Sequence, residues 1–129
     1  RRAAQLKIGS HFHFTGFLRG AEVDKMLAMS DVFVMPSVSE PFGIVPLEAM
    51  RSNVPVVISK QSGVAEILKH ASKVDFWDVD GMADAIYGLL NYPGAKKLFD
   101  KHGKAEVDSL KWENAAFNVK EVYKQVFPE

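Results

Sequence analysis

Two carboxylates, Glu40 and Glu48, stand eight positions apart in a stretch whose pattern places them at a binding edge. Glu40 falls in a loop rich in proline, glycine and serine, and Glu48 falls one turn into the helix expected after that loop. One short apolar run, 32–35, precedes the loop, and another, 54–58, follows the helix. Strand, loop, helix and strand in this order form the crossover unit of a parallel sheet. Because ligands of such sheets bind at loops that follow the C-terminal ends of strands, Glu40 is a candidate binding residue.

The start of this helix is a second candidate for ligand binding. A helical spacing of apolar residues begins at Ile44, and Pro46 is tolerated only in a first turn, so the helix is predicted over residues 44–52. No Ser, Thr, Asp or Asn immediately precedes Ile44, which leaves the first backbone N–H groups without a side-chain cap. Uncapped N–H groups at the positive end of a helix dipole favour an anion or a sugar hydroxyl.

Two simpler interpretations stay open from the residues alone. Ser37 or Ser39 could cap the helix, in which case Glu40 only interacts favourably with the helix dipole. Glu48 and Arg51 are three positions apart on the expected helix and could form a surface ion pair worth a few tenths of a kcal/mol. In either case the carboxylate concerned needs no ligand.

The residues around the two carboxylates resemble the Glu-x7-Glu signature of retaining glycosyltransferases of group 1, the family 4 or glycogen-synthase-like type. The resemblance extends over about the first ninety residues and is carried by segments 14–17, 30–37, 39–50, 55–57 and 62–67. The chain departs from the family pattern at two places. Asn53 stands where the family usually has Gly, and Asn is the next-best residue for a left-handed helix end. Ser62-Gly63 stands where the family usually has a Gly pair, in a ligand-facing loop.

The resemblance implies a role for individual residues. Glu40 is similar to the family's catalytic carboxylate beside the sugar of a nucleoside diphosphate sugar, where it favours an oxocarbenium-like transition state. Glu48 matches the residue that grips the two ribose hydroxyls, and the segment after the first strand matches the one that holds the base. The implied substrate-binding residues are Gly16, Phe17, Leu18, Pro41, Phe42, Gly43, Ile44, Val45 and Glu48. The resemblance implies no metal and no cofactor.

Alternating apolar strands and amphipathic helices predict an α/β parallel sheet with flanking helices. The expected strands are 12–15, 32–35, 55–59 and 73–76, and the expected helices are 21–29, 44–52, 64–70, 80–91, 95–110 and 112–127. Trp77 and Trp112 are expected to anchor the core or the helix packing. The resemblance implies the Rossmann-like C-terminal half of a GT-B fold. Residues 1–129 are then one truncated nucleotide-sugar-binding domain, in which 95–129 form a helical C-terminal extension.

The composition fits one compact domain, because 47% of the 129 residues are apolar. Lys plus Arg and Asp plus Glu both number 16, which argues against a nucleic-acid surface as the main partner. No cysteine is present, so no disulfide or thiolate chemistry is expected, and a cytoplasmic location is compatible with that. His11 and His13 alternate, but no third ligand lies in metal-binding spacing.

Residues 1–6 resemble the tail of a helix that is already under way. The family resemblance implies that an Arg and a Lys for the donor diphosphate, and an N-terminal domain that binds a glycan or small acceptor, precede residue 1. The expected function is therefore donor binding within an enzyme that transfers a sugar from a nucleotide sugar to an acceptor. Residues 1–129 alone are expected to be inactive, and the full-length enzyme is compatible with peripheral membrane association. The alternative is a non-catalytic nucleotide- or phosphate-binding α/β module.

Overall fold

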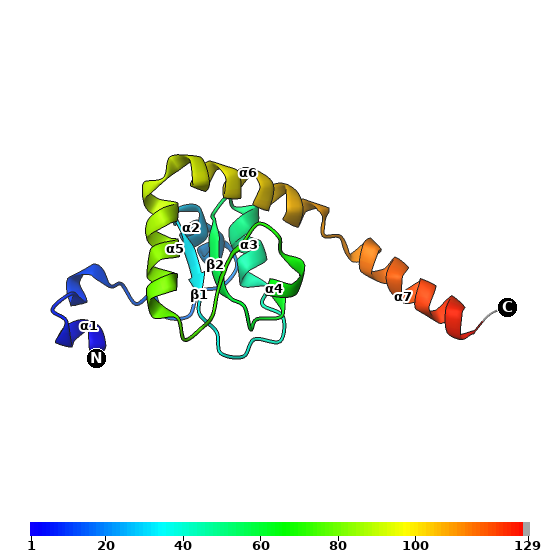
Figure 1. The fold of residues 1–129 in the computed structure, drawn as a ribbon, viewed down its shortest axis with the longest axis horizontal. Coiled ribbons are helices and arrows are strands. Elements are labelled where there is room, and N and C mark those ends of the chain that lie inside the picture. The colour runs from blue at the N-terminus through cyan, green and yellow to red at the C-terminus, as the bar shows by residue number, and fades with distance from the viewer. Residues whose placement is uncertain (128–129) are drawn as a thin grey trace.

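A computed structural model describes residues 1–127 and shows an α/β fold with a parallel sheet between helices (Figure 1). The strands β1 (Phe33–Met35), β2 (Val56–Ser59) and β3 (Ser72–Val74) pair in parallel in the order β1-β2-β3. The helices are α1 (Arg2–Gln5), α2 (Ala21–Ala28), α3 (Val45–Arg51), α4 (Val64–Ile67), α5 (Val79–Asn91), α6 (Pro93–Ser109) and α7 (Trp112–Val126), with a short 3-10 turn at Gly9–His11. The predicted fold class is confirmed.

The central strand β2 organises the core, because every one of its residues is buried. Val56 and Ile58 face a cluster formed with apolar residues of α2, α3, α4 and α6, while Val57 faces residues of α5 on the other side of the sheet. A strand covered on both faces is expected to be a continuous apolar run, which is how the sequence of β2 reads. The core therefore fixes β2 firmly and, with it, the connections that leave its C-terminal end.

The predicted strand at 12–15 is wrong. This segment is an irregular connection between the Gly9–His11 turn and α2, and its two aromatic residues, Phe12 and Phe14, are 52% and 85% exposed. Among the described residues β1 pairs only with β2, so no strand lies on the other side of β1. The alternating pattern was a sound local signal, but a strand forms only where another strand accepts its backbone hydrogen bonds.

The last two helices differ in how they relate to the sheet. Helix α6 packs against α3 and α5, and Pro93 at its first position ends α5 and begins α6 at the place where a missing N–H does no harm. Helix α7 extends away from the rest of the molecule and has no buried residue (Figure 1). The expectation that the tryptophans anchor the core or the helix packing is wrong, since Trp77 is 63% exposed and Trp112 is 89% exposed.

Within residues 1–127, the helices are all too short or too polar to cross a lipid bilayer.

Candidate functional site

The loop that carries Glu40 connects β1 to α3 and is held against the turn after β2. Glu40 forms an isolated parallel bridge with Ser62, and the Gly63 N–H donates to the Glu40 carbonyl at 2.9 Å. The Val64 N–H donates to the Phe42 carbonyl at 2.7 Å. Both connections leave the C-terminal ends of neighbouring parallel strands, so Glu40 lies at the C-terminal edge of the sheet, where the sequence places it. In parallel sheets this is the edge at which ligands commonly bind.

Two glycines allow these loops to meet. Gly43 has φ +90°, and a Cβ there would lie 3.1 Å from the Met35 methyl group and 3.2 Å from Glu40 Cγ. Gly63 has an ordinary φ, but a Cβ at this position would lie 2.0 Å from the carbonyl oxygen of Pro41. Gly43 is therefore required by backbone conformation, and Gly63 is required by the close approach of the neighbouring backbone.

The start of α3 has no side-chain cap, as predicted. Ile44 occupies the N-cap position without a capping hydrogen bond, and Pro46 lies in the first turn. The interpretation that Ser37 or Ser39 caps this helix is wrong; Ser37 instead uses its carbonyl to accept a hydrogen bond from the Ser59 hydroxyl. Within residues 1–127, no internal acceptor takes the backbone N–H of Ile44, which leaves this end of the helix open to a ligand.

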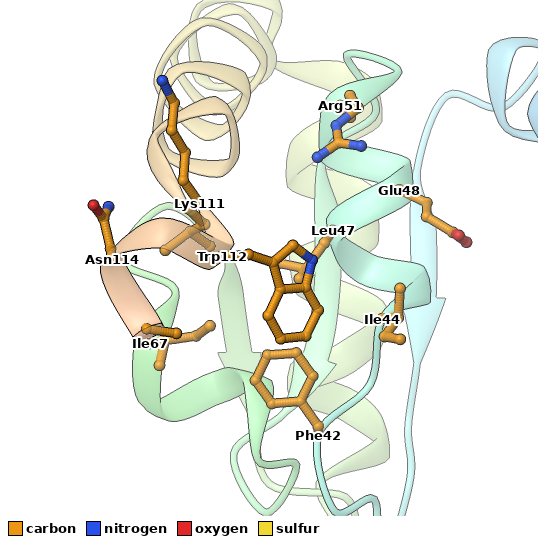
Figure 2. Close-up of a pocket in the computed structure, with 11 residues that line it drawn as sticks. Phe42, Ile44, Leu47, Glu48, Arg51, Ile67, Lys111, Trp112 and Asn114 are labelled. Carbon is orange, nitrogen blue, oxygen red and sulfur yellow. The ribbon is translucent and has the colours of Figure 1, made fainter. Parts of the chain in front are cut away.

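Glu48 lies in the first turn of α3 and is exposed. Figure 2 shows its carboxylate directed away from Arg51, and in the described part of the chain no ion pair joins the two. The simpler interpretation, a surface pair between Glu48 and Arg51, is therefore wrong. The carboxylate of Glu48 is free to accept hydrogen bonds from another molecule.

A pocket of about 520 Å³ opens on the α3 surface beside Glu48, and its lining is mainly apolar. Figure 2 shows Phe42 from the Glu40 loop and Trp112 from the start of α7 facing one another across it. Sequence reasoning missed this pocket because Trp112 was expected to be buried. The lining residues are Phe42, Ile44, Leu47, Glu48, Arg51, Ile67, Leu110, Lys111, Trp112, Asn114 and Ala115.

The three residues predicted to hold a base lie in the exposed connection before α2. Gly16 has φ +69°, Phe17 is 81% exposed, and Leu18 is half-buried. The guanidinium of Arg19 lies over the Phe17 ring, 4.9 Å from its centroid. In residues 1–127 no hydrogen bond joins this segment to the Glu40 loop.

A charged pair links the connections after β2 and β3. Lys60 Nζ lies 2.8 Å from Asp75 Oδ2, and the Gln61 amide donates to the other oxygen of the same carboxylate at 2.9 Å. The hydrogen bond from Lys60, followed by that from Gln61, lowers the pKa of Asp75. Lys60 thus has a partner that local sequence patterns did not indicate, because Asp75 lies fifteen residues away. No cluster of three or more His, Cys, Asp or Glu side chains suited to a metal occurs within residues 1–127.

The parallel sheet and its loop-to-helix site define an α/β domain of the Rossmann-like class. Residues 1–106 match the family described as glycosyl transferases group 1. The chain therefore belongs to this family of glycosyltransferases.

Individual relatives agree with this assignment. An uncharacterized glycosyltransferase of Methanocaldococcus jannaschii is 36% identical over 125 residues, which cover 93% of this chain and 32% of that protein. The sulfoquinovosyl transferase of Arabidopsis thaliana is 34% identical over 113 residues, covering 83% of this chain and 22% of that protein. The structure of sucrose-phosphate synthase from Thermosynechococcus elongatus matches 98% of this chain and 33% of its own, with a TM-score of 0.80 and 28% identity. The chain thus spans about a third or less of these proteins' length.

Proposed function

We propose that this chain forms the donor-binding part of a retaining glycosyltransferase, which moves a sugar from a nucleoside diphosphate sugar to an acceptor in glycan synthesis. Membership of the family supports sugar transfer. The observation that carries the proposal is the placement of Glu40. Its backbone is held at the C-terminal edge of the sheet, in the loop just before an uncapped helix start. A second carboxylate, Glu48, follows in the first turn of that helix and forms no ion pair within residues 1–127.

In this proposal Glu40 is the catalytic residue. Its carboxylate accepts hydrogen bonds from the hydroxyls of the donor sugar, and each charge-assisted bond contributes about 1.5–3 kcal/mol. The same negative charge stabilises the positive charge that develops at the anomeric carbon as the bond to the diphosphate breaks. The fixed backbone supports this role, because electrostatic stabilisation is effective only when the charged group is already in place.

The remaining residues bind the rest of the donor. The backbone of Pro41, Phe42 and Gly43 lies against the sugar, and the N–H groups of Ile44 and Val45 receive the phosphate at the positive end of the α3 dipole. Gly43 lacks a side chain, which lets the ligand approach closely.

Glu48 takes the two ribose hydroxyls, as its exposed and unpaired carboxylate allows. The segment Gly16, Phe17 and Leu18 contacts the base through backbone groups and the flat Phe17 ring. A reaction without metal or cofactor and an acceptor bound by another domain complete the proposal, and both points rest on the family resemblance. A cytoplasmic location is also proposed, because it is compatible with a sequence that has no cysteine.

A titration of this chain with a panel of nucleoside diphosphate sugars, followed by amide chemical shifts, tests the proposal. We expect one or more donors to shift the amides of Gly43, Ile44 and Val45 and the neighbourhood of Glu48. The free nucleoside diphosphate is the control, because it lacks the sugar that Glu40 is proposed to contact. If the sugar moiety adds nothing to the affinity or to the shifts near Glu40, the chain is better described as a nucleotide- or phosphate-binding module.

A further inference from the structure

Two serine side chains are buried next to the Glu40 loop. Ser59, the last residue of β2, is 0% exposed, and Ser62, in the turn that follows, is 1% exposed; in the described part of the chain they are the only buried polar residues. The Ser59 hydroxyl donates to the Ser37 carbonyl at 2.6 Å. The Ser62 hydroxyl donates to the Ser59 carbonyl at 2.8 Å. A hydroxyl is buried this deeply in proteins only where it has a partner, and both have one.

The Ser59 hydroxyl and two backbone N–H groups hold the Glu40 loop together. The carbonyls of Ser37, Glu40 and Phe42 accept hydrogen bonds from the Ser59 hydroxyl, the Gly63 N–H and the Val64 N–H, respectively. Glu40 therefore lies between two further attachment points, one on each side along the chain. Every donor comes from the short segment 59–64, which is anchored by the fully buried strand β2.

We propose that Ser59 and Ser62 are positioning residues, which fix the backbone of Glu40 through the Ser37 carbonyl and through the shape of the turn after β2. This inference rests on the proposed function, since it concerns how the catalytic carboxylate is held. Ser59 attaches the loop to the end of the central strand. Ser62 closes the turn that presents the Gly63 and Val64 donors, and in this position its side chain points into the protein and not toward a ligand.

Ser62 is one of the two positions where the chain departs from the family pattern, and this departure has a structural consequence. A glycine in its place would form the same backbone bridge but would lack the hydroxyl bond to Ser59. The neighbouring Gly63 has no such freedom, because a Cβ there would meet the Pro41 carbonyl. The serine therefore adds a hydrogen bond at the one member of the pair that can accept a side chain.

The test replaces Ser59 with alanine and with threonine in the natural full-length protein. Ser59→Ala removes the bond to Ser37, and we expect kcat to fall by about tenfold with little change in the donor KM, since misplacing a catalytic group mainly affects turnover. Ser59→Thr retains a hydroxyl and should restore most of the loss. Ser62→Gly should lower kcat by about threefold, as expected for the more indirect of the two attachments.

The matched control is Ser30→Ala. The Ser30 hydroxyl is half-buried and donates to the Met26 carbonyl at 2.8 Å, but it lies at the end of α2 and touches neither loop. Ser30→Ala should lower the melting temperature to a similar extent as Ser59→Ala and leave kcat unchanged. If Ser59→Ala behaves like Ser30→Ala, Ser59 contributes only stability and the positioning role is wrong.

A second measurement separates this inference from the proposed function. Hydrogen exchange of the Gly63 and Val64 amides in this chain should become about tenfold faster in Ser62→Gly, because loss of the turn's side-chain bond lets their bonds to the Glu40 loop open more often. Unchanged exchange would overturn the positioning role whatever the kinetics. Faster exchange with no effect of Glu40→Gln on turnover would support the attachment but contradict the catalytic role of Glu40. Ser62 lies in the turn after β2 and not in the buried strand itself, so the glycine variant remains informative if Ser59→Ala does not fold.

Discussion

The Glu40 loop, 36–44, and the connection before α2, 12–20, are both predicted to contact the same ligand, yet they differ in how they are held. Three carbonyls of the Glu40 loop accept hydrogen bonds from the segment after β2, and one of the donors is a buried side chain. The connection before α2 has no buried residue, and its aromatic side chains are exposed. One predicted binding segment is thus fixed in advance, whereas the other has few contacts to fix it.

The composition of the two segments does not explain this difference. Both contain glycines with positive φ, and both lie before a helix. The Glu40 loop follows β1, and the neighbouring strand β2 is buried on both faces. The connection that leaves β2 runs beside the Glu40 loop and holds it. Order in a loop therefore depends on the strand next to it, and a catalytic group is best placed where two such connections meet.

The largest effect is expected for Gly63→Ala, which breaks the contact between the two connections. A Cβ 2.0 Å from the Pro41 carbonyl forces the backbone apart, and we expect the free energy of unfolding to fall by about 3 kcal/mol, the upper end of the overpacking range. Urea denaturation of this chain measures the change. Gly88→Ala is the control: nothing lies within 4 Å of its Cβ, so alanine in helix α5 should stabilise by about 0.5–1 kcal/mol. Equal effects at the two glycines would contradict the described packing.

The next effect concerns the two carboxylates in the natural full-length protein. Glu40→Gln keeps the shape but removes the charge, and turnover should fall by about a hundredfold or more, as for the loss of one electrostatic contact in a transition state. Glu48→Gln should mainly raise the apparent Kd for the donor, because the ribose is remote from the bond that breaks. Steady-state kinetics with a varied donor separate the two.

These outcomes also judge the assignment itself. If both substitutions changed only affinity, Glu40 would be a binding residue and its catalytic role would be wrong. If neither changed anything, the Glu-x7-Glu interpretation would fail. Because no ion pair joins Glu48 to Arg51 within residues 1–127, Arg51→Gln serves as a control that should leave the donor affinity unchanged.

A pair of glycines with positive φ compares the two segments directly. Gly16→Ala should lower the free energy of unfolding by about 1 kcal/mol, since left-handed backbone disfavours a side chain but open space surrounds this one. Gly43→Ala has the same backbone penalty and adds crowding against Met35 and Glu40, so about 2 kcal/mol is expected. Thermal or urea unfolding of both variants measures the difference. A larger effect at Gly16 would mean that the connection before α2 is the better packed of the two.

The sequence predicted the elements around Glu40 well because local patterns determine them. The apolar run of β2 reflects burial on both faces, the missing cap of α3 follows from the residues before Ile44, and Asn53 ends that helix with φ +58° as expected. Pairing between distant segments was beyond the sequence. The strand predicted at 12–15 had the right alternation but lacks a neighbour, and the link from Ser59 to Ser37 spans 22 residues.

The smallest effect concerns a third connection, 69–70, which is fixed by a charge. Glu106 in α6 accepts hydrogen bonds from the backbone N–H groups of Lys69 and His70 and from the His70 ring. Partial burial raises the pKa of Glu106. The hydrogen bonds together lower it by more than burial raises it, so the net pKa lies below the ordinary value of 4.5. A carboxyl with a lowered pKa in the folded state stabilises the protein above its ordinary pKa, and the stabilisation is lost as the pH falls through the lowered value.

Acidification should therefore loosen the connection at 69–70 but not the Glu40 loop, whose attachments are neutral hydroxyl and amide groups. We expect hydrogen exchange of the Lys69 and His70 amides, corrected for intrinsic rates, to gain protection as the pH rises through the acid range, while Gly63 and Val64 change little. Glu106→Gln should remove this dependence, whereas Glu66→Gln, an exposed carboxylate without a hydrogen-bond partner in residues 1–127, should not. If Gly63 and Val64 lost protection at the same pH as Lys69, the two connections would open as one unit, and the separate attachment of the Glu40 loop would be wrong.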